Sequence, residues 1–353
     1  MKPVYLAGRG LACALGLDVQ ASLAALRQGG VATSRYSLPG ALGGSFPYRA
    51  IPCPRGDWNE RARDLVRRVA AEAGAQQIRS GALFIATSSF DIGGVEQGTA
   101  QMDYTSFSGK VAGWLEWSGP VYVINTACTS SLNALIAAQA MLNAGEVQDA
   151  LVLGIELDNQ LTMGGFAALQ LLSPGSSKPF GANRDGLVLG EAVAALRLSA
   201  HDPAQWQMLG GANVVDGSQP TGASAAAVVS MYQRALAASG LAANEIDLIK
   251  VQAAGSPGND AVEAQGLLEA FPKIPSLVSF KAAMGHTLGA SGAAEIALLT
   301  ACLEQGAWPK YEAAADTELG VVLAASAPDR VRHVLATILG FGGSHASVIL
   351  ERA

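Results

Sequence analysis

The chain has 353 residues, of which half are apolar and only 15% are charged. This length is sufficient for one large core or for two fused half-domains, and the low charge predicts an unusually large buried surface. The formal net charge of −6, without any basic cluster, argues against a nucleic-acid-binding surface.

The four cysteines and four histidines are scattered along the chain. Cys13, Cys53, Cys128 and Cys302 lie far apart and form no Cys-x-x-Cys pair. We therefore expect reduced thiols, no metal site and no cofactor. The first residues lack the features of a signal peptide, and the longest uncharged run, 117–145, contains many polar side chains. These features predict a soluble, cytoplasmic protein without a membrane span.

Short apolar runs alternate with alanine-rich stretches. The apolar runs predict β-strands at residues 4–7, 83–86, 122–125, 150–155, 192–198, 246–251, 278–280, 334–338 and 346–350. Between them, helices are expected at residues 19–28, 61–73, 129–144, 228–238, 260–270 and 290–305. This alternation predicts a layered α/β architecture whose strands are buried on both faces.

A composition change at residues 199–204 suggests a domain boundary. The apolar run that ends at Leu198 gives way there to a polar segment. We therefore divide the chain into an N-terminal half, 1–199, and a C-terminal half, 200–353. A faint internal repeat supports two similar halves, because strands 122–125 and 278–280 each lead through small residues into an alanine-rich helix.

Cys128 is the candidate nucleophile. It follows a predicted strand and directly precedes a predicted helix, so backbone N–H groups and the positive end of the helix dipole would favour its thiolate. Its small neighbours Ala127, Thr129 and Ser130 would leave room for an acyl chain. From this local pattern alone, a buried and unreactive cysteine is at least as good an interpretation.

Five motifs together are more specific than this local pattern. They are Leu6-Ala-Gly-Arg-Gly10 with Leu15-Gly16, Thr126-Ala-Cys-Thr-Ser130, Lys178-Pro-Phe-Gly-Ala-Asn-Arg-Asp-Gly-Leu-Val-Leu-Gly-Glu-Ala192, Lys281-Ala-Ala-Met-Gly-His286 and Gly340-Phe-Gly-Gly-Ser-His345. In content and order they resemble the motifs of the β-ketoacyl-acyl-carrier-protein synthases of the thiolase superfamily, along nearly the whole chain. The resemblance implies an α/β thiolase fold, in which two similar halves form an αβαβα layered sandwich.

The resemblance also implies roles for individual residues. Cys128 would accept an acyl chain from a carrier-protein phosphopantetheine thioester, after which a malonyl thioester is decarboxylated and joined to that chain. The backbone N–H groups of Cys128 and Phe341 would form the oxyanion hole, and Phe341 would gate the acyl pocket. His286 would bind the malonyl carbonyl. The ranges 104–117 and 163–172 are expected to set the depth of the pocket.

Lys281 occupies the position of a structural and electrostatic lysine of the family. The resemblance implies that it pairs with an acidic residue, and Glu191 and Glu295 are the candidates. Judged alone, Lys281 would be an ordinary lysine with a buried stem, and His286 a core histidine bonded to backbone. Their shared spacing favours the functional interpretation.

Three features depart from the family. Ala254 stands where a second catalytic histidine is expected, in a loop two residues shorter than usual, and alanine can neither donate a hydrogen bond nor carry a proton. His345 replaces the usual asparagine. It is either a substitute donor or an ordinary surface or turn histidine. The chain is also short before Cys128. Asn259-Asp260 is expected to cap the following helix.

The combination of a retained cysteine and a lost histidine favours a partner subunit. It resembles the short ketosynthase-like, chain-length-factor-type subunit of type II polyketide systems, including those for aryl polyenes. We expect a heterodimer with an active ketosynthase homologue, formed through strand 122–125 and its flanks, with an acyl carrier protein as second partner. The chain's own condensing activity would be impaired by Ala254.

Two alternative functions remain open at this stage. One is a competent β-ketoacyl synthase that uses Cys128, His286 and a substitute such as His345. The other is an acyltransferase that loads and releases chains on Cys128 without decarboxylation, because such transfer needs only a nucleophile and one base. The sequence contains no serine-hydrolase elbow, P-loop or dinucleotide-binding turn.

Overall fold

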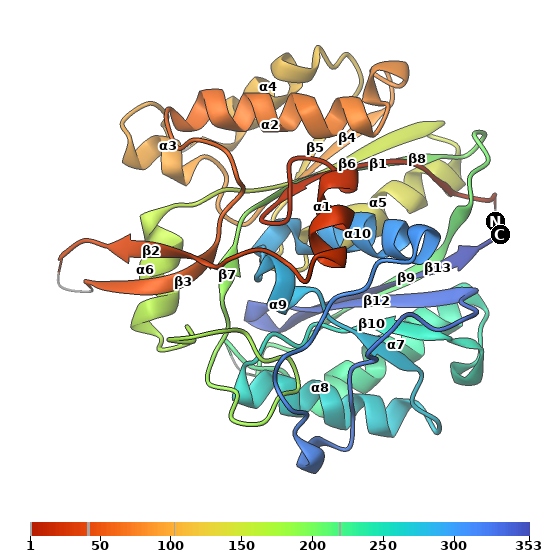
Figure 1. Cartoon of the computed structure of the whole chain (residues 1–353). Coiled ribbons are helices and arrows are strands. Elements are labelled where there is room, and N and C mark those ends of the chain that lie inside the picture. Colours follow the sequence, from red (N-terminus) through yellow and green to blue (C-terminus); the bar gives the residue numbers. More distant parts are fainter. Residues whose placement is uncertain (1, 41–42, 102, 219) are drawn as a thin grey trace.

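A computed structural model describes residues 2–40, 43–101, 103–218 and 220–353 (Figure 1). Ten strands form one large sheet in the order β11-β10-β12-β13-β9-β1-β8-β6-β4-β5. Their bounds are β1 Tyr5–Cys13, β4 Ala82–Ala86, β5 Val121–Ile124, β6 Asp149–Glu156, β8 Ala192–Ser199, β9 Trp206–Val215, β10 Leu248–Lys250, β11 Ser276–Val278, β12 His333–Leu339 and β13 Ser344–Arg352. A small second sheet contains β2 Ser34–Leu38, β3 Gly44–Arg49 and β7 Leu189–Gly190.

The two ends of the large sheet have the same plan. In β5-β4-β6-β8-β1, the first three strands are mutually parallel and the last two pair antiparallel. In β11-β10-β12-β13-β9, the same order and directions recur. A single register pair, Tyr5 with Gln207, joins β1 to β9. The division at residues 199 and 200 stays a prediction, and this repeated plan is what supports it.

The helices form three layers around the two half-sheets (Figure 1). The longer ones are α1 Val19–Arg27, α2 Trp58–Glu72, α4 Tyr104–Leu115, α5 Ser130–Ala144, α6 Gln160–Ala168, α7 Ala225–Ser239, α8 Pro257–Ala270 and α10 Ser291–Gln305. The short ones are α3 Ile92–Glu96 and α9 Lys281–Met284, with 3-10 turns at Ala75–Gln77, Ala243–Glu245, Leu288–Ala290, Thr317–Leu319 and Phe341–Gly343. Helices α2 and α4 cover one outer face, α7 and α8 cover the other, and α1, α5 and α10 fill the middle layer. The expected αβαβα sandwich is therefore confirmed.

Helix α10 lies at the centre of the molecule. Every residue from Ser291 to Cys302 is buried, as expected of a helix that is apolar on all sides and packs between two sheets. The helix ends at Gly306, whose φ of 68° closes it with a left-handed residue. This position matters for the site, because the one buried carboxylate on α10, Glu295, is placed between both halves.

Most of the predicted elements are present within a few residues, but several were missed. The sequence patterns did not predict β9, the small sheet, α4 or α6. Strand β9 lacks a clear signal because Gly210 and Gly211 interrupt it, and a Cβ at Gly211 would lie 2.8 Å from the carbonyl oxygen of Ser347. Among the described residues, no helix is long and apolar enough to cross a membrane.

Candidate active site

Cys128 lies in a tight turn between β5 and α5. Helix α5 begins at Ser130 with Thr129 at its N-cap position, so the thiol sits at the positive end of a 15-residue helix. The preceding residue, Ala127, has a φ of 52°, which is strained for a residue with a Cβ. This strained turn presents the sulfur to the interior while Cys128 remains 96% buried (4% exposed).

His286 faces the sulfur of Cys128. The distance from its Nε2 to the Cys128 Sγ is 3.0 Å. The chain holds the ring in place, because the His286 backbone N–H donates to the Val188 carbonyl at 2.8 Å. The structure therefore brings together the two residues that were predicted to form the centre of the site, from sequence positions 158 residues apart.

A buried charge cluster supports the imidazole. Lys281 Nζ donates to a Glu295 carboxylate oxygen, and it lies 3.2 Å from both His286 Nδ1 and Ser291 Oγ. Lys250 Nζ lies 2.7 Å from the other Glu295 oxygen. The ammonium of Lys281 has three hydrogens, and these three groups provide three acceptors. His286 Nδ1 is then an acceptor, so the ring proton is on Nε2 and points at the sulfur.

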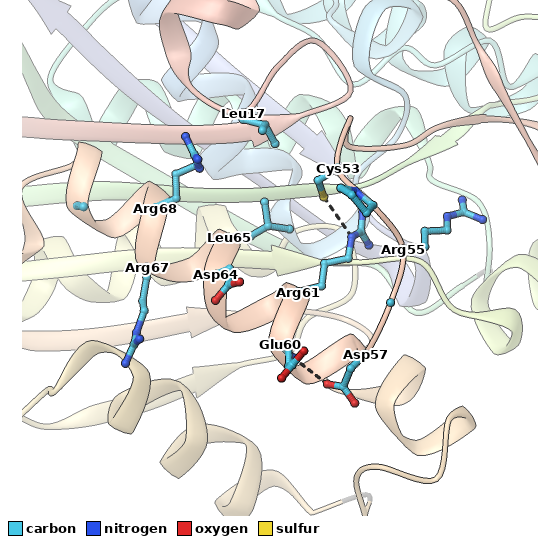
Figure 2. Close-up of a pocket in the computed structure, with 13 residues that line it drawn as sticks. Leu17, Cys53, Arg55, Asp57, Glu60, Arg61, Asp64, Leu65, Arg67 and Arg68 are labelled. Carbon is cyan, nitrogen blue, oxygen red and sulfur yellow. Dashed lines mark hydrogen bonds between the residues drawn. The ribbon is translucent and has the colours of Figure 1, made fainter.

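The partner of Lys281 is Glu295, and the alternative candidate Glu191 is wrong. Glu191 is buried elsewhere, where it accepts two hydrogen bonds from the guanidinium of Arg61 at 2.6 and 2.8 Å. Arg61 belongs to α2, and its Nε also donates to Cys53 Sγ at 3.3 Å (Figure 2). Sequence spacing did not separate the two glutamates, because both follow short apolar runs and only the packing of α10 decides between them.

A cavity of about 790 Å³ borders this Arg61 region, not the thiol. It runs along α2 and includes Cys53, Arg55, Arg67 and Arg68 among its lining residues (Figure 2). None of the residues around Cys128 and His286 lines it. The candidate active site is therefore the much smaller space at the thiol.

Burial dominates the protonation of the central pair. Desolvation raises the pKa of the Cys128 thiol to about 11, against the opposing effects of Lys281 and of backbone hydrogen bonds from Phe341 and Cys128 itself. Desolvation, with the nearby charges of Lys281 and Lys250, holds the pKa of His286 well below its usual value. The expected thiolate is therefore not the resting form, because the helix dipole and Lys281 do not outweigh burial.

Alkylation of Cys128 should reveal this raised pKa. In a Cys53→Ala background, the rate of reaction with iodoacetamide is expected to rise about tenfold per pH unit up to about pH 11. At pH 7 only about one thiol in 10,000 is ionised for a pKa of about 11. Lys281→Met should move the midpoint higher, because it removes a charge that favours the thiolate. A rate that levels off below pH 9 would contradict this prediction.

Phe341 is placed as the predicted gate would require. Its backbone N–H and that of Cys128 converge on the sulfur, the arrangement expected of an oxyanion hole. Its ring stacks on Phe166 of α6 with centroids 5.3 Å apart and planes 18° apart. The next residues fit only glycine, since Gly342 has a φ of 74° and a Cβ at Gly343 would lie 1.6 Å from the Asp216 carbonyl oxygen.

The space at the thiol is small. A cavity of about 20 Å³ is lined by Cys128, Leu187, Gln252, Ala254, Ser256, Asn259, Asp260, Glu263, His286, Leu339 and Phe341. This volume suffices for about one water molecule. An acyl chain can therefore bind only after side chains such as Phe341 move, which is consistent with a gate that is closed at rest.

Ala254 faces this cavity, as the predicted missing histidine implies. Two buried carboxylates hold its loop. Asp260 accepts from the backbone N–H groups of Ala254 and Gly255 at 3.1 and 3.0 Å, and Glu263 accepts from those of Gln252 and Ala253, both at 2.7 Å. Burial raises the pKa of Asp260 to about 6 and that of Glu263 to about 8. The methyl group is thus fixed in a well-ordered loop.

The expectation that Asn259-Asp260 caps the following helix is wrong. Helix α8 begins earlier, at Pro257, with Ser256 at the N-cap position. Asp260 lies in the first turn, and its carboxylate reaches back to the loop that precedes the helix and to the Phe180 N–H at 3.0 Å. The proline at the first helical position was the signal that the sequence interpretation overlooked.

His345 does not lie in a turn or on the surface. It is fully buried in β13, opposite Leu339 of β12, and neither ring nitrogen has a hydrogen-bond partner among the described residues. It is not among the residues that line the cavity at the thiol. Burial lowers the pKa of His345, and the negative charge of Asp216 opposes this shift only in part. The role of His345 as a substitute donor therefore stays a prediction. Its absence from the lining of the cavity argues against that role.

Sequence reasoning brought Cys128, His286, Lys281, Phe341 and Ala254 to one place. It missed three side chains that surround them, namely Lys250, Ser291 and Gln252, whereas Phe166 lies in the range 163–172 that was expected to set the depth of the pocket. Gln252 and Lys250 carried a weak signal, since polar side chains in or beside a buried strand normally have a specific role. Among the described residues, no cluster of three or more side chains could hold a metal ion.

Comparisons with known proteins agree with this site. The family model of the β-ketoacyl synthase N-terminal domain matches residues 69–204, and that of the C-terminal domain matches residues 208–313. The chain is 31% identical over 276 residues to erythronolide synthase EryA2 of Saccharopolyspora erythraea, covering 70% of this chain and 8% of that protein. It is 30% identical over 266 residues to the chloroplastic 3-oxoacyl-[acyl-carrier-protein] synthase II of Arabidopsis thaliana, covering 67% and 48%.

Solved structures match the fold over the whole chain. A ketosynthase (ApeO) in complex with its chain length factor (ApeC) from Xenorhabdus doucetiae aligns with a TM-score of 0.85 at 24% identity, covering 100% of this chain and 98% of that chain. The ishigamide ketosynthase/chain length factor aligns with a TM-score of 0.87 at 21% identity, covering 100% and 99%. This likeness shows a thiolase-type ketosynthase fold.

The two domain matches, the fold and the residues around Cys128 define a class of proteins. The chain belongs to the β-ketoacyl synthase family. It spans less than half the length of the two curated relatives described above.

Proposed function

We propose that this chain is a ketosynthase-like subunit of a type II fatty acid or polyketide system, of the aryl polyene kind. It works in the cytoplasm as the chain-length-factor-like partner of an active ketosynthase. Its own decarboxylative condensation is impaired. The observation that carries this proposal is the methyl group of Ala254, which faces the cavity of Cys128 and His286 where the family has a second histidine. Two solved neighbours that pair a ketosynthase with a chain length factor support the choice of partner.

The site is built for transfer of an acyl chain to Cys128. The Cys128 thiol first gives its proton to water, and the thiolate sulfur then attacks the carbonyl carbon of a carrier-protein thioester, so that the negative charge moves to the carbonyl oxygen. The backbone N–H groups of Cys128 and Phe341 receive that charge. The carbon–sulfur bond to the carrier then breaks, and the carrier thiolate takes up a proton. His286 Nε2–H stabilises the developing Cys128 thiolate, because its ring accepts from Lys281 at Nδ1 and is no base in this tautomer.

Decarboxylation of a malonyl thioester demands more of the site than acyl transfer does. When carbon dioxide leaves, the negative charge collects on the thioester oxygen. In the family, two imidazoles donate hydrogen bonds to that oxygen. Here His286 is one such donor and Ala254 supplies none. Loss of one oxyanion-type donor typically lowers a rate by about 10²–10³. The chain is therefore expected to load acyl groups and to condense them poorly.

The experiment is co-expression with a full-length ketosynthase, followed by assays of the complex. We expect a stable heterodimer, and we expect that Ala254→His raises malonyl decarboxylation by this subunit by about 10²-fold, because it restores a donor. The partner's own activity is removed by replacing its active-site histidines with alanine. A homodimer of the unmodified chain that elongates acyl chains at a rate unaffected by Ala254→His would refute the proposal.

The edge strand β5 is the proposed contact with the ketosynthase. It has a neighbour on one side only, β4, so its outer backbone groups are free to pair with another strand. Tyr122 is 38% exposed there and stacks on Phe84 with centroids 5.0 Å apart. We expect Tyr122→Asp to weaken the heterodimer at least tenfold in analytical ultracentrifugation, since a charge would be buried at the contact.

The matched control for this prediction is Leu268→Asp. Leu268 is also a partly exposed apolar residue, at 48%, but it lies on α8 at the far side of the molecule. Its replacement should leave the dissociation constant unchanged. Equal effects of the two substitutions would argue against β5 as the contact.

Transfer without decarboxylation is a second candidate function, and one observation favours it. The pair of Cys128 and His286 and the Lys281–Glu295 support are complete, so the nucleophile and the donor that stabilises its thiolate are both present. This candidate predicts an acyl adduct on Cys128 without any release of carbon dioxide, even after Ala254→His.

A further inference from the structure

Gln252 is a polar side chain in the thiol cavity that the proposed function leaves without a role. It lines the same 20 Å³ space as Cys128, His286 and Ala254. It is 8% exposed, and its Oε1 is buried without a hydrogen-bond partner among the described residues. A buried amide that lacks a partner costs about 1–3 kcal/mol, so its presence needs an explanation.

The backbone places Gln252 at the thiol cavity. Lys250 reaches Glu295 of the middle layer, whereas Val251 and Ala253 pack in the core beneath α7 and α8. Gln252 and Ala254 follow β10 in an irregular loop, where both line the thiol cavity and Ala254 packs against the middle layer. The Gln252 backbone N–H is held by Glu263 at 2.7 Å. The amide is thus two residues from the missing imidazole, in the same cavity.

The chemistry of an amide suits this position. Gln252 carries two N–H donors and one acceptor oxygen, and rotation about its last side-chain bond exchanges them. The cavity has room for one small group at rest. The unpartnered atom is the acceptor Oε1, which a thioester oxygen cannot satisfy, so this rotation must first turn the N–H donors toward that oxygen. Unlike alanine, the amide can donate to an oxygen that gains negative charge.

We propose that Gln252 is a catalytic hydrogen-bond donor that takes over part of the role of the histidine replaced by Ala254. This inference rests on the proposed function. It names the residue that supports the residual decarboxylation of the malonyl thioester. When the bond between the malonyl carboxylate and its neighbouring carbon breaks, carbon dioxide leaves and the electron pair forms an enolate. The thioester oxygen takes the negative charge and accepts hydrogen bonds from Gln252 and from His286 Nε2–H.

The carbon–carbon step then follows without further groups. The enolate carbon attacks the carbonyl of the acyl group on Cys128, the carbon–sulfur bond breaks and Cys128 leaves as a thiolate. His286 Nε2–H stabilises that thiolate at 3.0 Å. The Gln252 amide is neutral and neither accepts nor releases a proton near neutral pH. It therefore replaces a histidine only as a hydrogen-bond donor.

The test measures carbon dioxide release from malonyl-pantetheine. It uses the full chain in a heterodimer whose partner subunit has its active-site histidines replaced by alanine. Gln252→Met keeps the length of the side chain but removes its donors, and it should lower carbon dioxide release at least about tenfold. Acyl loading of Cys128, followed by intact mass, should fall less than carbon dioxide release does. Gln252→Met combined with Ala254→His should recover the lost rate, because the imidazole replaces the amide.

Gln265→Met is the matched control. Gln265 is exposed on α8 and bonds Glu269 at 2.8 Å, away from the cavity, so its replacement should leave carbon dioxide release unchanged. The inference is overturned if Gln252→Met releases carbon dioxide at the parental rate, or if the parental subunit releases none above the level without protein. A lack of heterodimer, or no gain from Ala254→His, would instead count against the proposed function.

Discussion

Replacement of Cys128 by alanine is expected to abolish the acyl adduct on this chain. Incubation with an acyl-pantetheine thioester should add the acyl mass to the parental chain in intact mass spectrometry, and Cys128→Ala should show none. The reason is geometric, because Cys128 alone has an imidazole at 3.0 Å and two backbone N–H groups directed at its sulfur.

The other thiols provide the controls for this experiment. Cys302 is fully buried, and burial raises its pKa to about 12. Cys302→Ala should therefore keep the adduct at the parental level, and so should Cys53→Ala. An adduct that persists in Cys128→Ala, or that disappears in Cys53→Ala, would place the nucleophile elsewhere.

The second large effect is expected for Glu295→Gln. Lys250 and Lys281 are both fully buried, and Glu295 is the carboxylate that they share. Its neutralisation removes the carboxylate that these two buried ammonium groups share. Breaking a buried ion pair in this way typically costs about 3–5 kcal/mol, so denaturant unfolding should show a loss of that size.

The pH dependence of this loss has a definite sign. Although burial opposes ionisation, Lys250 and Lys281 hold the pKa of Glu295 below its usual 4.5. The Glu295 contribution is therefore fully present above about pH 4.5 and is lost as the pH falls through the lower pKa of the folded state. The difference between Glu295→Gln and the parental chain should be largest near neutral pH and should shrink in acid.

An exposed ion pair serves as the comparison. Glu116 bonds Arg79 at 2.8 Å, but both side chains are largely in solvent. Glu116→Gln should change the free energy of unfolding by less than about 1 kcal/mol, because water screens the pair. If Glu295→Gln costs no more than Glu116→Gln, the buried cluster does not carry the charges that we assign to it.

The sequence predicted those features that depend on local pattern. Apolar alternation located most strands and helices, and five ordered motifs located Cys128, Lys281, His286 and Phe341. These predictions succeeded because each motif is a short continuous segment, so its residues can be recognised without knowing how distant segments pack. The absence of a histidine at Ala254 was visible for the same reason.

The features that depend on packing between distant segments were not predictable in this way. Glu295 and Glu191 were equal candidates until α10 placed one of them against Lys281 and α2 placed Arg61 against the other. His345 looked like a turn residue because glycines precede it, yet it begins the buried part of β13. Gln252 gave only a weak signal as a polar residue beside a buried strand, and its role became apparent only from the cavity that it lines.

The raised pKa of Cys128 was missed for a physical reason. Helix position and nearby lysine charge can be read from sequence, but the depth of burial cannot. Here burial is the largest contribution to the pKa of both Cys128 and His286. The direction of the pKa shift of Cys128 could therefore be determined only from the three-dimensional structure.

The charge cluster around Glu295 has a consequence for how the interior of this chain is built. Three ionised side chains in a protein interior are costly to dehydrate, and apolar side chains of similar volume often give an equally or more stable core. A chain whose only duty was to shape a neighbouring subunit would gain nothing from Lys250, Lys281 and Glu295. Their dehydration cost is offset by no gain in packing, and Lys281 lies 3.2 Å from the imidazole that faces the sulfur, so the cost of the cluster is tied to the chemistry of this thiol.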